Sequence, residues 1–443
     1  MNTPIADFLK QYAYDENVRF HMPGHKGNAF VGCETFDITE VKGADALYEA
    51  NGIILESEKN ASVLFGTKKT VYSTEGSSQC IKAMLHLALT YKKRSGRPYV
   101  IAARNAHKAF LYAVALLDLD VVWLMPDESS SICTCPITEG QIEEEISRRD
   151  DVPIAVYLTS PDYLGGMSDI EAIAKVCHKY GTVLAVDNAH GAYLRFLNKS
   201  MHPMDMGADI CCDSAHKTLP VLTGGAYLHI SKNAPEYFSE NAKGAMALFG
   251  STSPSYLTLM SLDICNDYIE NGYFSALQAT VTNVKSVKEA LTDLGWDVLE
   301  TEPLKIVLKS PKVATCEGIA NMLRRKQIEC EYADKDYIVF MITPENSYDE
   351  LQYLVEALGE NHLGPSENKT LKPVKGKQEM SVRKAMFSHQ EKVPIEDALG
   401  RICASPMVSC PPAIPIVVSG ESISEEAIRL FKYYKIQDVL VVN

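Results

Sequence analysis

Between about residue 60 and residue 230, short apolar runs rich in β-branched residues alternate with amphipathic stretches of helical periodicity. Strands that are apolar along their whole length are typical of parallel sheets covered on both faces, and the helices between them supply the crossovers. The pattern therefore predicts an α/β fold in which a mostly parallel sheet lies between helices. The clearest strand candidates are residues 98–103, 120–125, 153–159 and 182–187.

Helix boundaries in this region carry their own signals. Thr138 with Gln141 and Ser168 with Glu171 have the spacing of capping boxes, in which side chains satisfy the first backbone N–H groups of a helix. Gly181 follows the second of these helices, where glycine favours the left-handed conformation that ends a helix.

The chain beyond residue 254 has a different pattern. Two long helices are predicted there, the second from Ala276 to Leu294. They are followed by short strands at 305–309 and 337–342 and by helices near 316–327 and 347–359, which together predict a small α+β domain. The predicted divisions are an N-terminal segment (1–60), a large ligand-binding domain (61–275), the small domain (276–361), a Gly/Pro/Lys-rich linker (362–378) and a C-terminal domain (379–443).

Composition excludes several classes of protein. The 443 residues include 43 basic and 57 acidic ones, and the formal charge of −14 disfavours nucleic acid as a partner. No apolar run approaches the roughly 18 residues of a membrane span, and the first residues do not resemble a signal peptide. Twelve cysteines are too dilute for a disulfide scaffold and lack the spacing of a zinc site. We therefore expect a cytoplasmic protein that binds neither a membrane nor a structural metal.

A lysine occupies an unusual position in this pattern. Lys217 lies between the apolar run at 208–212 and the strand candidate at 223–230. Burying an ammonium group is costly and lowers its pKa, and a partly desolvated amine is nucleophilic near neutral pH. Lys217 is therefore a candidate for imine formation. The alternative is a lysine that reaches solvent from a loop.

Asp187 ends the strand candidate at 182–187. The carboxyl ends of strands in such sheets are where ligands bind. If the ligand were pyridoxal phosphate (PLP), a carboxylate there would keep the ring nitrogen protonated, which makes the ring the electron sink that PLP chemistry requires. The alternatives are a helix cap or a metal ligand.

Two further features have the chemistry of a cofactor site. Residues 73–79 contain small hydroxyl residues and a glycine directly before a helical run, which is the composition of a phosphate-binding helix N-terminus. Serines that cap a helix without any phosphate are the alternative. His107 follows the strand candidate at 98–103 and has the flat ring needed to stack on a cofactor, although a loop histidine is the simpler interpretation.

Six motifs follow one another along the chain: His21–Gly27, Asp37–Glu40, Arg104–Lys108, Asp187–Ala192, Ser214–Leu219 and Ser251–Tyr256. Together they resemble the motifs of the ornithine/lysine/arginine decarboxylase family in its short, Gram-positive-type form. Residues 411–415 and 420–421 resemble that family's C-terminal motifs. The resemblance implies the aminotransferase-like fold type I of PLP enzymes, with a smaller α+β domain and a C-terminal appendage.

The resemblance also implies a role for each matching residue. Lys217 would form the imine with PLP, and Asp187 would pair with the ring nitrogen. His107 would stack on one face of the ring and Ala189 would pack on the other, with His216 beside the phosphate or the imine. The phosphate would be held by Gly76, Ser77, Ser78 and Ser214, with Ser251 or Thr252 reaching the phosphate of the partner subunit in a homodimer or higher homo-oligomer.

Three residues depart from the family pattern. Asn188 and Tyr193 stand where the family usually has Glu and His, and Glu75 stands where it usually has Asn. Glu75 places a negative charge beside the expected phosphate site. The departures leave Lys217 and Asp187 in place, so they bear on the substrate more than on the cofactor.

The implied reaction is decarboxylation of a basic amino acid, with arginine favoured over lysine and ornithine, as part of polyamine biosynthesis. Lys217 or His216 is the candidate acid that returns a proton to the α-carbon. Glu421, from either subunit, is the candidate partner of the substrate's side chain, and an ordinary surface glutamate is the alternative. A transaminase or lyase on the same scaffold, or a catalytically silent PLP-fold binding protein, remains an alternative function.

Overall fold

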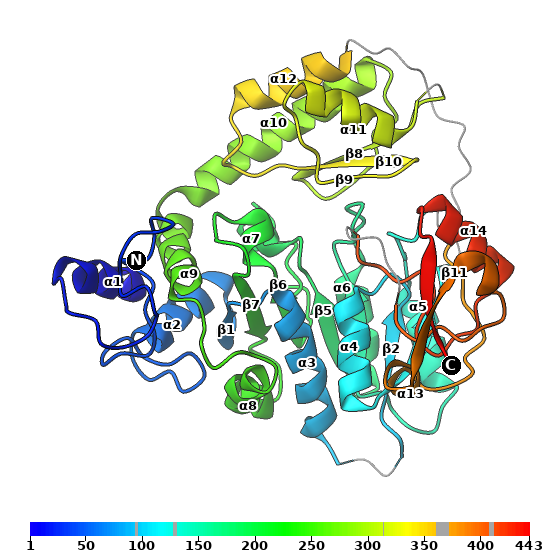
Figure 1. Ribbon diagram of the computed structural model, residues 1–443, viewed down its shortest axis with the longest axis horizontal. Coiled ribbons are helices and arrows are strands. Elements are labelled where there is room, and N and C mark those ends of the chain that lie inside the picture. The colour runs from blue at the N-terminus through cyan, green and yellow to red at the C-terminus, as the bar shows by residue number, and fades with distance from the viewer. Residues whose placement is uncertain (94–95, 127–130, 313, 360–371, 407–411) are drawn as a thin grey trace. The chain divides into compact units, whose positions relative to one another are not determined.

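The computed structural model describes residues 1–93, 96–126, 131–312, 314–359, 372–406 and 412–443. The chain forms two compact units, each built from two separate stretches. The first unit comprises Met1–Lys93 and Val183–Ala276, and the second comprises Arg94–Thr182 and Leu277–Asn443. The first unit is therefore blue and green in Figure 1, whereas the second is mainly cyan and yellow to red.

The first unit contains a sheet of strands flanked by helices (Figure 1). Its strands lie in the order β1 (Lys69–Ser73), β7 (Ala226–Ile230), β6 (Ile210–Asp213) and β5 (Val183–Asp187). Strand β7 is antiparallel to both neighbours, whereas β5 and β6 are parallel. Its helical elements are α1 (Pro4–Tyr14), α2 (Ile53–Phe65), α3 (Ser77–Tyr91), η1 (Ala192–Phe196), α7 (Ala215–Thr218), α8 (Glu236–Ala247), α9 (Tyr256–Tyr268) and η2 (Ile269–Tyr273).

The register of this sheet gathers three strand ends at one edge. Asp187, the last residue of β5, pairs with Cys212, which is next to the last residue of β6. Asp213 pairs with Tyr227, and the neighbouring Ala226 pairs with the last residue of β1. The loops that follow β1, β5 and β6 therefore leave the sheet on the same side, and these loops carry most of the predicted cofactor residues.

The second unit contains three parallel strands in the order β4 (Ala155–Thr159), β2 (Tyr99–Ala103) and β3 (Asp120–Leu124) among its described residues. Helices α4 (Lys108–Leu117), α5 (Glu139–Ser147) and α6 (Ile170–Lys179) follow these strands. All four strands predicted by the apolar runs, including β5, are present. The parallel pairs and the flanking helices confirm the predicted α/β class.

The later part of the second unit is antiparallel. Strands β8 (Lys305–Lys309), β10 (Tyr337–Met341) and β9 (Tyr332–Ala333) form one sheet, and β11 (Gln390–Pro394) pairs with β12 (Asp438–Val442) in another. The small α+β arrangement predicted from the sequence is therefore present. The accompanying helical elements are α10 (Phe274–Asp293), α11 (Cys316–Arg325), α12 (Tyr348–Gly359), α13 (Val382–Met386), η3 (Ile395–Asp397) and α14 (Glu425–Tyr433).

The C-terminal residues share an apolar core with the small antiparallel sheet. Val307 and Val339 from that sheet belong to the same buried cluster as Val393, Phe431 and Val441. Most of the predicted linker lies outside the described residues, since 360–371 are not described, and so does residue 411 of the C-terminal motif. The predicted domain boundaries stay predictions.

The predicted helix boundaries were partly right. Thr138 caps α5 and forms a capping box with Gln141, as predicted. The second predicted box was wrong, because α6 begins one residue later and the carboxylate of Asp169 accepts the N–H of Ala172 at 3.0 Å. Gly181 has a φ of +67° and follows the end of α6, as expected for a glycine that ends a helix.

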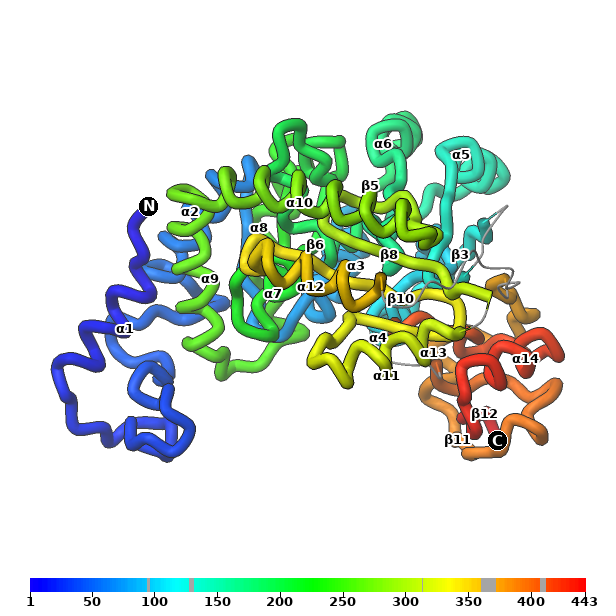
Figure 2. The backbone as a smooth tube through the Cα atoms, turned by 90° about the horizontal axis from the view of Figure 1, so that it is seen from above, coloured from blue at the N-terminus to red at the C-terminus, as the bar shows by residue number. Residues whose placement is uncertain are grey.

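Residues 15–52 join α1 to α2 without forming a helix or strand, and Figure 2 shows them as a looped segment near α1. The start of α1 is fixed by Asp263 of α9, whose carboxylate accepts the N–H groups of Ile5 and Ala6 at 2.9 Å each. Among the residues that the structure describes, none of the helices has the length and apolar character needed to cross a bilayer.

Candidate active site

Asp187 lies at the carboxyl end of β5 with its side chain buried. Its Oδ1 atom accepts the N–H of Ala189 at 3.3 Å and the S–H of Cys212 at 3.7 Å. Burial raises the pKa of the Cys212 thiol well above its usual value, so the thiol remains a donor. These contacts hold the orientation of the Asp187 carboxylate within the loop that follows β5.

Lys217 lies in the short helix α7, which follows β6. Its Nζ is 2.9 Å from Nε2 of His190, a nearly buried residue three positions after Asp187. The contact joins the loop after β5 to the loop after β6 and places an imidazole beside the candidate nucleophile. We did not single out His190 from the sequence. Its place in the same motif as Asp187 was the available signal.

His216 has one ring nitrogen fixed by the backbone. Its Nδ1 lies 3.0 Å from the carbonyl of Gly225, and because a carbonyl only accepts, Nδ1 carries the proton. Burial lowers the pKa of His216, and the neighbouring charge of Lys217 lowers it further. The imidazole of His216 is therefore neutral near pH 7, and its Nε2 is unprotonated.

The predicted phosphate residues meet at the start of α3. Gly76 precedes this helix with a φ of +72°, and no side chain caps the helix among the described residues. Its N–H donates to Gly224 at 2.7 Å, which fixes the turn. Ser77 at the first helical position contacts the hydroxyl of Ser214 at 2.8 Å. The first backbone N–H groups of a helix and a pair of hydroxyls form a donor set suited to an anion.

Glu75 is directed at a neighbouring loop. Its carboxylate accepts the backbone N–H of Ser251. The side chains of Ser251 and Thr252 are exposed. The negative charge of Glu75 is thus hydrogen-bonded within the first unit. The contact of Ser251 or Thr252 with the phosphate of the other subunit stays a prediction.

The other two predicted site residues of the second unit have partners there. His107 caps α4, with its Nδ1 accepting the N–H of Ala109 at 3.1 Å. Glu421 is 1% exposed, and its Oε2 lies 3.1 Å from Nη2 of Arg104 and 3.0 Å from the N–H of Val418. Glu421 is thus no ordinary surface glutamate. A role for either side chain against cofactor or substrate stays a prediction.

One group of described residues has the composition of a metal site, namely His202, Cys211 and Asp213. Asp213 already accepts a hydrogen bond from His202 at 3.0 Å. Burial raises the pKa of the Cys211 thiol well above its usual value, whereas a metal needs the thiolate. Hydrogen bonding is therefore sufficient to explain this cluster, and the expectation of no metal site stays a prediction.

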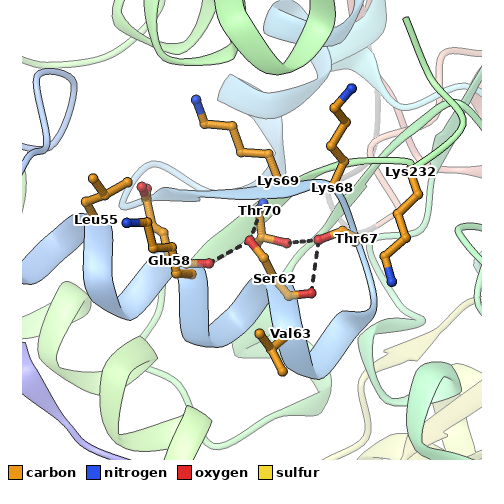
Figure 3. A pocket seen from close by; sticks show the side chains of 10 residues that line it. Leu55, Glu58, Ser62, Val63, Thr67, Lys68, Lys69, Thr70 and Lys232 are labelled. Carbon is orange, nitrogen blue, oxygen red and sulfur yellow. Dashed lines mark hydrogen bonds between the residues drawn. The ribbon is translucent and has the colours of Figure 1, made fainter. Parts of the chain in front are cut away.

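A cavity of about 560 Å³ lies beside α2 and the start of β1 (Figure 3). The hydroxyls of Thr67 and Thr70 bond to each other at 2.8 Å, and the hydroxyl of Ser62 accepts the N–H of Thr70. Lys69 donates to a backbone carbonyl at 2.9 Å. The cavity lies at the amino end of β1, opposite the end that leads to Gly76, and the fold itself uses several of its polar groups. We assign no ligand to it.

Comparison with known proteins identifies the family. The sequence matches the family model for the major domain of Orn/Lys/Arg decarboxylases over residues 3–313 and the model for their C-terminal domain over residues 367–440. The chain belongs to the Orn/Lys/Arg decarboxylase family. It is a PLP-dependent decarboxylase with the fold type I architecture. The predicted resemblance and cofactor are thereby confirmed, and decarboxylation is favoured over the alternative functions.

This decarboxylase has similar proteins that match it over most of their length. The uncharacterized protein YaaO of Bacillus subtilis is 29% identical over 97% of this chain and 93% of its own. Arginine decarboxylase of Bacillus subtilis is 26% identical over the same shares. The crystal structure of the Francisella novicida lysine decarboxylase LdcF superposes with a TM-score of 0.83 at 18% identity, covering 100% of this chain and 81% of that one.

The first unit of this decarboxylase has residues that suit PLP. It combines an amine, a buried carboxylate and an uncapped helix N-terminus with two hydroxyls, at one edge of a single sheet. An added Cβ at Gly76 would meet no atom closer than 4.0 Å, so space remains above the turn. The amine matches the aldehyde of the cofactor, the carboxylate matches its ring nitrogen, and the helix N-terminus with the hydroxyls matches its phosphate.

Proposed function

We propose that this PLP-dependent decarboxylase removes the α-carboxylate of arginine. The observation that carries the proposal is the likeness to arginine decarboxylases of Bacillus along nearly the whole chain. The formal charge of −14 is compatible with a cationic substrate. We further propose that the enzyme works in the cytoplasm and that its product amine supplies polyamine biosynthesis.

The site residues of the first unit that suit PLP each have a proposed part in the reaction. Bound PLP supplies an electron sink for the pair of electrons that departing CO₂ leaves behind. Lys217 holds the cofactor covalently, and the carboxylate of Asp187 keeps the ring nitrogen protonated. Ser77, Ser214 and the N-terminus of α3 bind the phosphate.

Two histidines are placed to handle protons. His190 Nε2 lies 2.9 Å from Lys217 Nζ, so it is positioned to accept the proton that the ammonium must lose before it becomes a nucleophile. The ring of His216 is held by Gly225 through Nδ1, which leaves Nε2 as the atom that exchanges a proton. We propose that the proton for the α-carbon comes either from Lys217 in its ammonium form or from His216 after its Nε2 has taken up a proton from solvent.

We also propose that the enzyme is a homodimer with a shared active site. The segment from Tyr14 to Val31 exposes several large apolar side chains, with Phe20 at 94% and Val31 at 87%. Such side chains are normally covered by a partner, and a second copy of this chain is the occupant we propose. The exposed side chains of Ser251 and Thr252 are available to that partner.

The substrate proposal is tested by incubating the PLP-loaded enzyme with arginine, lysine and ornithine in parallel while CO₂ and amine are quantified. We expect kcat/KM to be highest for arginine. Faster turnover of lysine or ornithine refutes the substrate, and formation of a keto acid without CO₂ refutes the reaction.

Replacement of the proposed nucleophile tests the site. Lys217→Ala is expected to abolish turnover and the absorbance near about 420 nm that PLP attached to a lysine gives. Lys175→Ala, which changes an exposed lysine of α6, is the matched control and is expected to retain both. Unchanged turnover in Lys217→Ala contradicts the assignment.

A further inference from the structure

Asp213 is the last residue of β6 and is fully buried directly before Ser214. Three side chains donate to its carboxylate. Asn188 Nδ2 lies 2.7 Å from Oδ1, while His202 Nε2 and His229 Nε2 lie 3.0 and 3.1 Å from Oδ2. None of these residues was assigned to the cofactor or the substrate, yet Asn188 directly follows Asp187.

The hydrogen bonds define the charge of this cluster. His202 Nδ1 accepts the backbone N–H of Met204 at 3.3 Å, so the proton of His202 lies on Nε2 and the ring is a neutral donor. Burial lowers the pKa of His229, which also favours a neutral ring. Burial alone would raise the pKa of Asp213, but the two histidines lower it below the usual value. Asp213 is therefore a single buried negative charge.

Asn188 is attached to β6 at two points. Its backbone N–H donates to the carbonyl of Cys212 at 2.9 Å, and its side chain donates to Asp213. Its Oδ1 atom is buried without a hydrogen-bond partner among the described residues, and an added Cβ on Gly191 would come within 2.1 Å of that atom. The side chain is therefore closely confined, and little space remains for a longer one.

The departure from the family pattern at this position has a physical explanation. A glutamate at position 188 would be longer and would bring a second carboxylate against Asp213 in a fully buried site. Two carboxylates in such contact cannot both stay ionised. An amide satisfies the same oxygen without adding charge, so the identity of residue 188 is matched to the acid at 213.

We propose that the hydrogen bond between Asn188 and Asp213 is a positioning device that aligns the loop bearing Asp187 and His190 with the loop bearing Ser214 and Lys217. This inference rests on the proposed function, which makes those two loops the two sides of the cofactor site. Asp213 and Asn188 are positioning residues, because neither is proposed to touch cofactor or substrate.

Reciprocal substitutions test the proposal. Asp213→Asn removes the charge, Asn188→Asp places two carboxylates together, and Asn188→Ala removes the donor without adding charge. The double variant Asn188→Asp with Asp213→Asn exchanges acid and amide and restores one of each. Asp263→Asn is the matched control, since it also neutralises a buried carboxylate of the first unit, one that binds the start of α1.

The first measurement is PLP affinity, which is obtained from the absorbance at about 420 nm during titration with the cofactor. We expect each single change at 188 or 213 to weaken PLP binding by about tenfold. This corresponds to the interaction free energies found between side chains that are hydrogen-bonded to each other. The exchanged double variant is expected to recover most of this loss, and Asp263→Asn to retain wild-type affinity. A double variant no better than the singles, or an equal loss in Asp263→Asn, overturns the proposal.

The second measurement uses the protein without cofactor. Hydrogen exchange at the backbone amides of residues 188–191 and 214–217 is expected to quicken in Asp213→Asn and in Asn188→Ala, but not in Asp263→Asn. Unchanged exchange in both of these variants overturns the positioning role. Because this readout needs neither PLP nor substrate, failure of the arginine proposal alone leaves its result intact.

Discussion

Two buried carboxylates of this enzyme are stabilised in opposite ways. Asp213 in the first unit is surrounded by neutral N–H donors from Asn188 and two histidines. Glu421 in the second unit faces a cation, Arg104, from a part of the chain 317 residues away. The first arrangement satisfies both oxygens and aligns neighbouring loops. The second joins distant segments but leaves Glu421 Oε1 and Arg104 Nη1 without hydrogen bonds among the described residues.

In this enzyme the buried charge of Asp213 is thus stabilised by hydrogen bonds from neutral side chains of neighbouring loops, whereas that of Glu421 is stabilised by an ion pair across a long sequence separation. Both members of a buried ion pair lose their hydration. Removing one member leaves the other as an unpaired buried charge, which strongly lowers the free energy of unfolding. An acid held by several neutral donors keeps part of its hydrogen bonding after a conservative change.

Removing the cation should therefore have the largest effect. Arg104→Met leaves Glu421 buried without a counter-charge, and we expect a loss of about 3 to 5 kcal/mol in the free energy of unfolding. The guanidinium lies 5.3 Å from the ring centre of Trp123, so tryptophan fluorescence during urea denaturation reports on this region. Arg104→Met with Glu421→Leu is expected to recover most of the loss. A double variant as unstable as the single one contradicts this account.

The second-largest expected effect is a dependence of the free energy of unfolding on pH. Burial raises the pKa of Asp263 to about 6, above the 3.8 of the free group, so the folded protein binds this proton more tightly than the unfolded chain. The stabilisation is present in full below pH 3.8 and is lost as the pH rises through about 6, which amounts to roughly 3 kcal/mol at about 1.4 kcal/mol for each pKa unit. Unfolding curves of wild type and Asp263→Asn between pH 4 and 7 should show a weaker pH dependence in the variant. Parallel curves contradict the prediction.

Neutralising Asp213 should lower the free energy of unfolding by less than removing Arg104 does. In Asp213→Asn an amide oxygen still accepts from one or both imidazoles, and only part of the network is left unsatisfied. We expect a loss of about 2 kcal/mol, measured by thermal unfolding without cofactor. Because the lowered pKa of Asp213 stabilises the fold only while the acid is ionised, the wild type should approach the variant as the pH falls below about 4. A loss larger than that of Arg104→Met contradicts the comparison.

An exposed ion pair provides the smallest effect. Lys175 and Glu171 lie 2.8 Å apart on the surface of α6, and like Arg104 and Glu421 they pair a cation with a carboxylate, but both of their side chains are exposed to water. Glu171→Gln is expected to leave the unfolding midpoint unchanged at physiological salt, because solvent screens such pairs. A shift comparable with that of Arg104→Met would show that burial does not decide the strength of these pairs.

The sequence predicts the strand ends well because their signal is local. Uninterrupted apolar runs mark β2 to β5, and the chemistry of Lys217 and Asp187 is visible from their positions after such runs. The cap of α6 was misplaced because Ser168 and Asp169 are adjacent and both are good caps, so only the backbone decides between them. A single sequence does not reveal which distant residues meet.

The missed contacts all join residues that are not neighbours in the sequence. His190 meets Lys217 across 27 positions, and Asp213 meets His202 and His229 across 11 and 16 positions. Arg104 finds Glu421 near the other end of the chain. In each case the residue type was visible in the sequence, whereas the partner depends on how β5, β6 and β7 or the C-terminal segment pack.

The discontinuity of the first unit has a consequence for synthesis on the ribosome. Strand β1 pairs with β7, in which Ile230 is the partner of Lys69, so the first strand waits until far more chain has been translated. At about 5 to 20 residues per second, that interval is on the order of ten seconds. During this interval the nascent chain exposes the unpaired edge of β1, which can pair with other chains. The rate of translation and the binding of a chaperone would therefore determine how much of the polypeptide escapes aggregation.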